Sequence, residues 1–456
     1  MIHYHVLSLV LLLGCVAVPN TVRAQGFIIP ELGIRKNAMG AAIGRPDELA
    51  AIYHNPAALA LLPGTQIQLS GGLVFLGTDI RLKPWKVNPT DASYYMADPV
   101  ESDGYYARQT PNVVAGIPMI GISTKLWSDK VAGALGIYVP NAAGADFGAS
   151  EPSRYHIIDA YLFSAFFTAA VAYRPLPWLA VGLGASAVYI RIHRTAILYP
   201  VVDNVDYGWA LGKDAELTLE GEDVRPAFNL GIQVWPLKQL SLGFMVLSRY
   251  DVALEGPLRL KNGSGLLFKT DPTITDNQQR TEIVAPWVFG FGANYDITSW
   301  LEVGAEFRYY LTSQVEDQVT TITEGGLKDL MPNGLVTPKN QHDAFHTGGG
   351  FNVKPPWHLP VELELMTGAY YETSASPDNT VEVSAPSFDI VSYHFGGRVT
   401  IKKKYRVSLA YGHYWYLERT TTASITSPPT NFVGSGHSDM LTLVLDMHFG
   451  SGIGVK

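Results

Sequence analysis

Histidine and serine are the first residues to consider for chemistry in this sequence, and their spacing favours none. His342 and His346 lie four residues apart in a predicted loop or strand start, which is not a recognised metal-ligand pattern. No Gly-x-Ser-x-Gly nucleophile elbow is present. Nothing indicates the Ser and His residues that barrel-embedded lipases carry near their rim. We therefore expect no catalysis, no metal site and no cofactor.

Apolar residues in two long predicted loops, 196–223 and 255–282, suggest recognition of a hydrophobic molecule. Apolar side chains gathered in loops are unusual unless they bind something or pack on one another. One interpretation is capture of a hydrophobic ligand, and the other is that the two loops form a lid. The candidate capture residues are Leu198, Tyr199, Trp209, Leu211, Leu266 and Phe268.

A ligand carboxylate would favour an arginine or lysine partner. Arg154, Arg308 and Arg398 are candidates by position. The alternative is that these arginines pair with carboxylates of the protein itself, such as Glu302, Glu306, Glu362 and Glu364.

The segment Asn55-Pro56-Ala57, followed by Leu59, predicts a compact turn just before the first strand-like stretch. Proline fixes its own φ and moves the preceding residue out of the helical region. A turn placed ahead of a long series of strands suggests a plug before a barrel. The alternative is an ordinary loop turn.

Period-2 alternation defines the elements that must position these residues. It is clearest at 179–187, 301–309 and 441–449, where an apolar row faces small or charged residues. About fourteen strands are predicted, near 65–82, 111–126, 131–140, 157–174, 178–195, 224–236, 240–254, 283–296, 300–314, 343–354, 359–373, 389–403, 405–419 and 438–449. Short links alternate strictly with long ones, which is typical of outer-membrane barrels with short periplasmic turns and long outer loops. The predicted fold class is therefore an all-β, transmembrane, antiparallel β-barrel with a small N-terminal hatch in its lumen.

Five of the nine tryptophans lie beside predicted short turns, namely Trp127, Trp178, Trp235, Trp300 and Trp357. Tryptophan favours the membrane–water interface because its ring is amphipathic. The alternative is five unrelated core tryptophans. Their shared position favours a rim at one membrane surface.

Composition agrees with a barrel that has one face in lipid. Hydrophobic residues make up 47% and charged residues 16% of 456, with a formal net charge of −8 and no strong basic block for nucleic-acid binding. Val6–Val18 is apolar but too short to span a bilayer, and Val22-Arg23-Ala24 predicts signal cleavage before Gln25. Leu12-Leu13-Gly14-Cys15 offers the alternative of a lipidated Cys15. The expected domains are a signal peptide (1–24), a hatch (25–64), a barrel (65–449) and a tail (450–456).

Several pieces, in order, resemble the FadL/TodX (OMPP1) family of outer-membrane transporters for long-chain fatty acids and other hydrophobic compounds. Gly26-Phe27 and Asn55-Pro56-Ala57 resemble the family's hatch, and 133–147 (GALGIYVPNAAGADF) resembles its third strand. Segments 217–221, 228–231, 250–256, 376–378 and 394–415 resemble its middle and late strands. Two departures stand out: Ala58 replaces a frequent glycine, and Asn141-Ala142-Ala143-Gly144 replaces a frequent Phe-Gly after the proline.

The resemblance implies a mechanism. Outer loops capture a hydrophobic ligand, the hatch (Asn55, Pro56, Ala57) moves, and the ligand leaves sideways through a gap at an inward kink of the third strand. Pro140, Asn141 and Ala142 would form that kink, since proline offers no N–H to a ladder. A plain strand end at Pro140 is the alternative.

Passive uptake of fatty acids or hydrocarbons across the outer membrane of a Gram-negative bacterium is the leading hypothesis. The expected partners are these small molecules, outer-membrane lipid and lipopolysaccharide, with no nucleic acid and a monomeric barrel. A general or polar-solute porin is the second hypothesis, and the predicted hatch argues against it. A surface receptor or adhesin barrel is the third.

Overall fold

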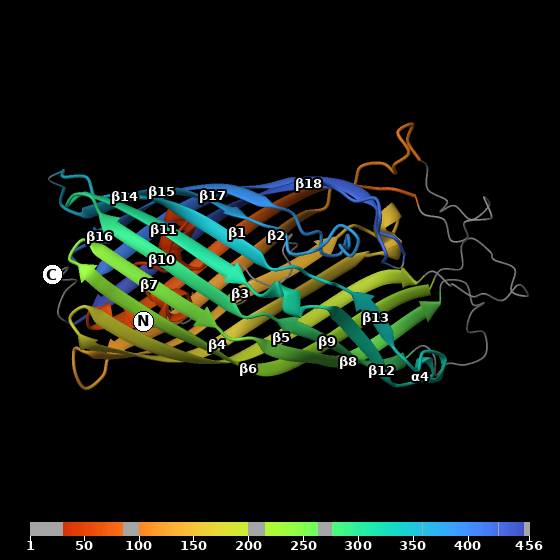
Figure 1. Cartoon of the computed structure of the whole chain (residues 1–456), viewed down its shortest axis with the longest axis horizontal. Helices are drawn as coiled ribbons and strands as arrows, with labels where there is room; N and C mark the ends of the chain where they lie inside the picture. Colours follow the sequence, from red (N-terminus) through yellow and green to blue (C-terminus); the bar gives the residue numbers. More distant parts are fainter. Residues whose placement is uncertain are drawn as a thin grey trace, which may run out of the picture.

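The computed structural model of the chain describes residues 31–84, 100–198, 215–262, 276–357, 359–426 and 428–450. Its strand segments form one closed antiparallel sheet around a small N-terminal helical unit (Figure 1). The short turns lie at one end of the barrel and the longer loops at the other. No helix in these ranges is long and apolar enough to cross a membrane.

Eighteen strand segments make up the described sheet. They are β1 (Thr65–Leu82), β2 (Asn112–Lys125), β3 (Val131–Asp146), β4 (Asp159–Leu176), β5 (Leu179–Leu198), β6 (Ala215–Leu237), β7 (Leu240–Leu247), β8 (Tyr250–Asn262), β9 (Asp276–Ala285), β10 (Val288–Asp296), β11 (Leu301–Tyr310), β12 (Asp317–Glu324), β13 (Leu335–Pro338), β14 (Ala344–Val353), β15 (Glu362–Glu372), β16 (Ile390–Ile401), β17 (Tyr405–Thr420) and β18 (Phe432–Phe449). Four barrel strands consist of two segments each, namely β7 with β8, β9 with β10, β11 with β12, and β13 with β14. The barrel therefore has fourteen strands, which confirms the predicted fold class.

Pairing of the first strand with the last closes the barrel. β1 and β18 run antiparallel in unbroken register from Thr65 opposite Phe449 to Leu82 opposite Phe432. Closure removes the free sheet edges that an open sheet would expose. The short helices of the described chain are α2 (Gly33–Met39), α3 (Ala51–His54), η1 (Pro56–Leu61), η2 (Pro152–Tyr155), η4 (Thr312–Gln314) and α4 (Leu327–Leu330).

The alternation in β18 places apolar side chains outside the barrel and polar ones inside. Leu443 and Met447 are 45% and 42% exposed, whereas Thr442 and Asp446 are 2% exposed. β11 repeats this arrangement, with Phe307 and Tyr309 outside and Glu302, Glu306 and Arg308 buried. An apolar outer face over a polar lumen is the reverse of a water-soluble β-sandwich and suits a barrel in lipid.

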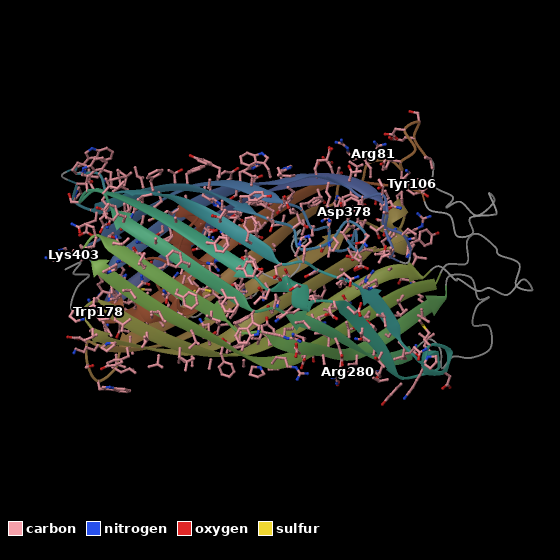
Figure 2. The ribbon with its side chains drawn as sticks, viewed as in Figure 1. Arg81, Tyr106, Trp178, Arg280, Asp378 and Lys403 are labelled. Carbon is pink, nitrogen blue, oxygen red and sulfur yellow. The ribbon has the colours of Figure 1, made fainter. Side chains whose placement is uncertain are left out.

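Four of the five predicted rim tryptophans are exposed beside short turns: Trp127, Trp178, Trp300 and Trp357. Trp235 is partly buried against the core. Figure 2 places Trp178 with Lys403 at the short-turn end of the barrel, away from Arg81 and Arg280 near the other end.

Some strands extend further than predicted. β5 and β6 continue to Leu198 and Ala215, beyond the predicted ends at 195 and 224. In the β6 part of this extension the outward side chains include Glu220 and Glu222, and Glu222 lies opposite Arg191 of β5. The hydrophobic alternation ends where the outer face leaves the apolar belt, although backbone pairing continues.

Candidate functional site: the hatch and the neighbouring barrel wall

The hatch is defined here as residues 31–64, which lie inside the barrel. Its helix α2 contacts β14 to β18, whereas η1 contacts β3 to β6. Residues 31–60 are buried, apart from Arg45 and Asp47, which are partly exposed. The hatch therefore touches opposite sides of the lumen with two different faces.

Asn55 joins three parts of the structure. Its backbone is extended (φ −166°, ψ 94°), as the proline that follows requires, and its Oδ1 accepts a hydrogen bond from the N–H of Ala57 (3.3 Å) at the start of η1. Its Nδ2 donates to the carbonyl oxygens of Ile43 (3.2 Å) and Ile232 (3.1 Å) and to Oε1 of Gln233 (2.9 Å). The predicted turn thus fastens η1, the α2–α3 connection and strand β6 to one another.

Glycines on the inner wall allow the hatch backbone to approach closely. A Cβ atom at Gly231 of β6 would lie 2.2 Å from Oδ1 of Asn55, and one at Gly182 of β5 would lie 2.4 Å from the N atom of Ala57. On β7, a Cβ at Gly243 would lie 2.0 Å from the carbonyl oxygen of Ile43. These distances are far below van der Waals contact, so adjacent strands accept the hatch only because they lack side chains here.

The opposite face of the hatch is held by buried ion pairs. Arg35 of α2 makes a bidentate pair with Glu302 of β11 (2.8 and 3.0 Å). Lys36 lies 2.8 Å from Oε1 of Glu306, whose Oε2 accepts the N–H groups of Ala42 (2.7 Å) and Ile43 (3.0 Å). Buried ion pairs with good geometry are costly to break, because removal of one partner leaves the other charge buried and unpaired.

Asp47 of the hatch connects two arginines. Arg398 of β16 binds it with both Nη atoms (2.9 and 3.0 Å), and Nε of Arg35 lies 3.0 Å away. Burial alone would favour the neutral acid, but these guanidinium groups hold the pKa of Asp47 well below its usual range. By contrast, burial raises the pKa of the neighbouring Glu48.

His54 is held neutral at the end of α3. Arg308 donates to its Nδ1 (2.9 Å), and because guanidinium has no acceptor, the ring proton is on Nε2, which donates to the carbonyl oxygen of Leu32 (2.7 Å). Burial and the nearby Arg308 charge lower the pKa of His54 to about 3. Protonation of this ring is therefore incompatible with the arrangement.

The ladder between β2 and β3 ends early. Within the described residues of both strands, its pairs run from Lys125 opposite Ala132 to Met119 opposite Tyr138 and go no further. The β3–β4 register also shifts between Tyr138 and Asn141, around Pro140. The residues 112–118 of β2 and 139–146 of β3 thus face each other without ladder pairing.

The burial pattern of strand β3 changes at Pro140. In–out alternation holds up to Tyr138, after which Pro140, Asn141 and Ala142 are all buried. Asn141 donates to Oγ of Ser164 on β4 (2.8 Å) and reaches the hydroxyl of Tyr250 on β8 (3.5 Å). Proline at this site has no N–H for the ladder, which accounts locally for the break.

An aromatic series connects the hatch with this break. The ring of Tyr53 in α3 lies 5.8 Å from that of Tyr138, which stacks on Phe166 at 5.6 Å, and Phe166 meets Tyr250 edge-on at 6.3 Å. These centroid distances are those of favourable aromatic pairs. A continuous series of ring contacts therefore joins the hatch to the residues beside the break.

A second, partly buried segment, residues 373–389 between β15 and β16, packs toward the long-loop end. Val381, Val383 and Phe388 are buried, and Phe388 stacks on Tyr416 of β17 (6.0 Å) and meets Phe432 of β18 (6.5 Å). Arg419 binds Asp378 of the segment (2.8 Å), which Figure 2 shows between the middle and the long-loop end.

The predicted ligand residues have different outcomes. Tyr199, Trp209, Leu211, Leu266 and Phe268 lie outside the described residues, and of Leu198 only the backbone, paired with Ala215, is described. Arg308 and Arg398 bind carboxylates of the protein, Glu306 (2.7 Å) and Asp47, as the alternative interpretation held. Arg154 donates to the carbonyl oxygen of Glu151 in its own loop (3.0 Å), and Glu362 is exposed.

Sequence reasoning missed Arg35, Lys36, Asp47 and Tyr53. One signal was available: two adjacent cations in a segment predicted to enter a barrel require carboxylates, and Glu302 and Glu306 alternate onto one face of a predicted strand. His342 and His346 do not share a site, since His346 binds Lys36 (2.6 Å) and Glu372 (2.9 Å). Among the described residues, no group of three or more His, Cys, Asp or Glu side chains could hold a metal ion.

Comparisons with known proteins agree with this architecture. A Pseudomonas aeruginosa FadL homologue is 15% identical, with a TM-score of 0.76, over 93% of this chain and 100% of that one. The Pseudomonas putida toluene transporter TodX is 17% identical (TM-score 0.69, 94% and 100% covered), and the Ralstonia pickettii toluene transporter TbuX is 16% identical (TM-score 0.63, 94% and 100% covered). At these identities the likeness shows the fold. No curated protein sequence matches the chain.

Residues 15–442 match the family described as outer membrane protein transport protein (OMPP1/FadL/TodX). That match covers nearly the whole chain and agrees with a closed barrel that carries an apolar outer face. The chain therefore belongs to the OMPP1/FadL/TodX family of outer-membrane proteins that transport hydrophobic compounds.

Proposed function

We propose that this protein takes up fatty acids or hydrocarbons passively, with capture by its outer loops, movement of the hatch and lateral release between β2 and β3. The observation that carries the proposal is the end of the β2–β3 ladder at Met119 and Tyr138, where Tyr53 of the hatch contacts Tyr138. An apolar molecule gains about 0.8 kcal/mol per buried CH₂ group, so direct passage from the lumen into lipid avoids a costly aqueous step.

The hatch residues Asn55, Pro56 and Ala57 form the gate in this proposal, and Pro140, Asn141 and Ala142 shape the exit. We assign 1–24 to the signal peptide, 25–64 to the hatch, 65–449 to the barrel and 450–456 to the tail. The outer apolar face contacts outer-membrane lipid and lipopolysaccharide, and the closed sheet acts as a monomer. Capture involves the loop residues Leu198, Tyr199, Trp209, Leu211, Leu266 and Phe268. Transporters of toluene among the similar structures support hydrocarbons as a substrate class.

A steric test addresses the exit directly. Ala142→Trp places a large ring at the buried kink, whereas Ala169→Trp places the same ring on the exposed outer face of β4. Both barrels should fold, as heat-modifiable migration on gels would show. Uptake of labelled hydrocarbon or fatty acid into cells should fall about tenfold or more in Ala142→Trp and stay near wild type in Ala169→Trp.

Deletion of 140–142 gives a second test, since it removes the kink and should abolish uptake while the barrel still folds. Normal uptake by this folded deletion variant would refute the lateral route. Steady, large ion conductance of the wild-type protein in a planar bilayer would instead favour a porin.

A further inference from the structure

The lumen is divided into a charged side and an uncharged side. The buried ionisable groups of the wall gather on β11 and β14 to β18, with Glu302, Glu306, Arg308, His346, Glu372, His394, Arg398, Arg406, Asp446 and His448. From the level of Tyr138 toward the long-loop end, the inward faces of β1 to β4 carry no charged side chain among the described residues. Val74, Ile117, Met119 and Phe166 belong to this uncharged side.

The break between β2 and β3 opens on the uncharged side. Hatch residue Tyr53 and wall residues Tyr138 and Phe166 lead toward it, and the polar groups beside the two wall rings are neutral amides and hydroxyls. Tyr138 bonds the hydroxyl of Thr168 (2.8 Å), which bonds Ser186 (2.7 Å). A molecule that leaves by this route meets aromatic and aliphatic surface with neutral hydrogen-bonding groups.

The cations around the hatch are already engaged. Arg35, Lys36, Arg308 and Arg398 each lie within 3.0 Å of a carboxylate oxygen. Arg406 donates to the carbonyl oxygen of Asp47 (2.9 Å) and lies across the ladder from Asp446. A ligand carboxylate could bind Arg35, Lys36, Arg308 or Arg398 only by displacing a carboxylate of the protein.

Carboxylates already match the cations around the hatch. The cations Arg35, Lys36, Arg308, Arg398 and Arg406, with the half-buried Arg45, lie among the carboxylates of Glu31, Glu302, Glu306, Glu372 and Asp446, with the half-buried Asp47 and Glu364. Neither oxygen of Asp446 has a hydrogen-bond partner within the described structure. A further carboxylate would be repelled, and burial of an unpaired charge is strongly unfavourable.

We infer that the compound released between β2 and β3 is uncharged, a hydrocarbon or another neutral apolar molecule, and that fatty-acid anions are selected against. This inference rests on the proposed lateral release and specifies its substrate class. Apolar burial is nearly the same for a neutral molecule and a carboxylate of equal chain length, so the discrimination comes from the unpaired charge.

Matched pairs of probes test it in cells that express the full-length protein and in cells with an empty vector. Dodecan-1-ol and laurate share a chain length, and toluene and benzoate share a ring. At pH 8 we expect protein-dependent uptake of each neutral probe to exceed that of its anion about tenfold or more. As the pH falls toward the carboxyl pKa, about 4 to 5 for such groups, the two rates should converge because the acid becomes neutral.

A variant reverses the discrimination. Met119 is the last paired residue of β2 at the break, and Met119→Arg adds a permanent cation there. It should raise laurate uptake relative to dodecan-1-ol several-fold, whereas Met119→Gln, of similar length but neutral, should not. The wild-type comparison remains decisive if Met119→Arg fails to fold.

Equal or faster uptake of laurate than of dodecan-1-ol at pH 8, with laurate uptake above the empty vector, would overturn the neutral-substrate inference and leave the proposed transport function intact. Uptake of none of the four probes above the empty vector would overturn the proposed function, and the inference with it.

Discussion

Replacement of Gly231 by alanine should loosen the hatch. The added Cβ would lie 2.2 Å from Oδ1 of Asn55, 2.8 Å from Cδ of Pro56 and 2.9 Å from the N atom of Ala57. All three distances are shorter than real Cβ contacts. Asn55 cannot rotate away freely, because its amide is held by Ile43, Ile232 and Gln233.

The magnitude follows from the two ways in which the structure can respond. If the hatch stays in place, the overpacked contact costs about 1–3 kcal/mol. If Asn55 moves, hydrogen bonds worth about 0.5–1.5 kcal/mol each are lost, which gives a similar total. A destabilisation of about 1–3 kcal/mol raises the population of an undocked hatch roughly 5- to 150-fold.

Two measurements report the undocked population. Backbone amide exchange of residues 51–61 should accelerate by that factor in Gly231→Ala, while exchange in the barrel strands stays unchanged. Brief openings should become more frequent in single-channel recordings. Gly116→Ala is the matched control, since a Cβ at Gly116 of β2 meets no atom within 4 Å.

Equal hatch protection in Gly231→Ala, Gly116→Ala and wild type would refute the reasoning. It would mean that the hatch tolerates displacement from β6 at no cost, so the glycines on β5 to β7 would not define its position.

The remaining predictions concern the charged face of the hatch. Glu302→Gln removes the carboxylate that Arg35 binds and leaves the buried guanidinium facing a neutral amide. This change should destabilise hatch docking by about 3 kcal/mol, measured by amide exchange of residues 33–39. Glu362→Gln, at an exposed site on β15, should have no effect; equal protection in both variants would contradict the role of the Arg35–Glu302 pair. Acidification should also undock the hatch: the pKa of His54 is about 3 in place and near 6.5 when released, so stability is present above pH 6.5 and is lost as the pH falls toward 3. At pH 4.5 the hatch loses about 2–3 kcal/mol of docking free energy, seen as more frequent openings than at pH 7. His54→Gln should reduce this difference in opening frequency between pH 7 and pH 4.5. If the difference between pH 7 and pH 4.5 were unchanged in His54→Gln, the effect would belong to other groups, such as Asp47.

Much of the fold was predictable because barrel strands repeat a local rule. Along 441–449 every second residue must be compatible with lipid. This requirement is visible in the local sequence, because it depends on neighbouring residues and not on distant contacts. Strand ends were less predictable. Outside the apolar belt both faces of β5 and β6 meet polar surroundings, so the alternation of hydrophobicity disappears at Arg191 and Glu222 although pairing continues.

The candidate site divides in the same way. The turn at Asn55-Pro56 and the interruption at Pro140 were visible because proline acts on its own backbone and that of its neighbour. Whether the wall lacks pairing there depends on β2 as well, where the ladder stops at Met119. The sequence of 140–142 alone does not specify where the neighbouring strand β2 ends its hydrogen bonds with β3.

The sequence by itself therefore determined a fourteen-stranded barrel, its apolar outer face, its tryptophan rim and a turn ahead of the first strand, since each follows from periodicity or from residues close in the chain. Only the tertiary structure decided which charges are paired and which wall of the lumen is uncharged. Arg35 and Glu302 are 267 residues apart, and Asn55 and Gln233 are 178 apart. Such partners meet only when the barrel closes around the hatch, so their pairing is a property of closure and not of any segment.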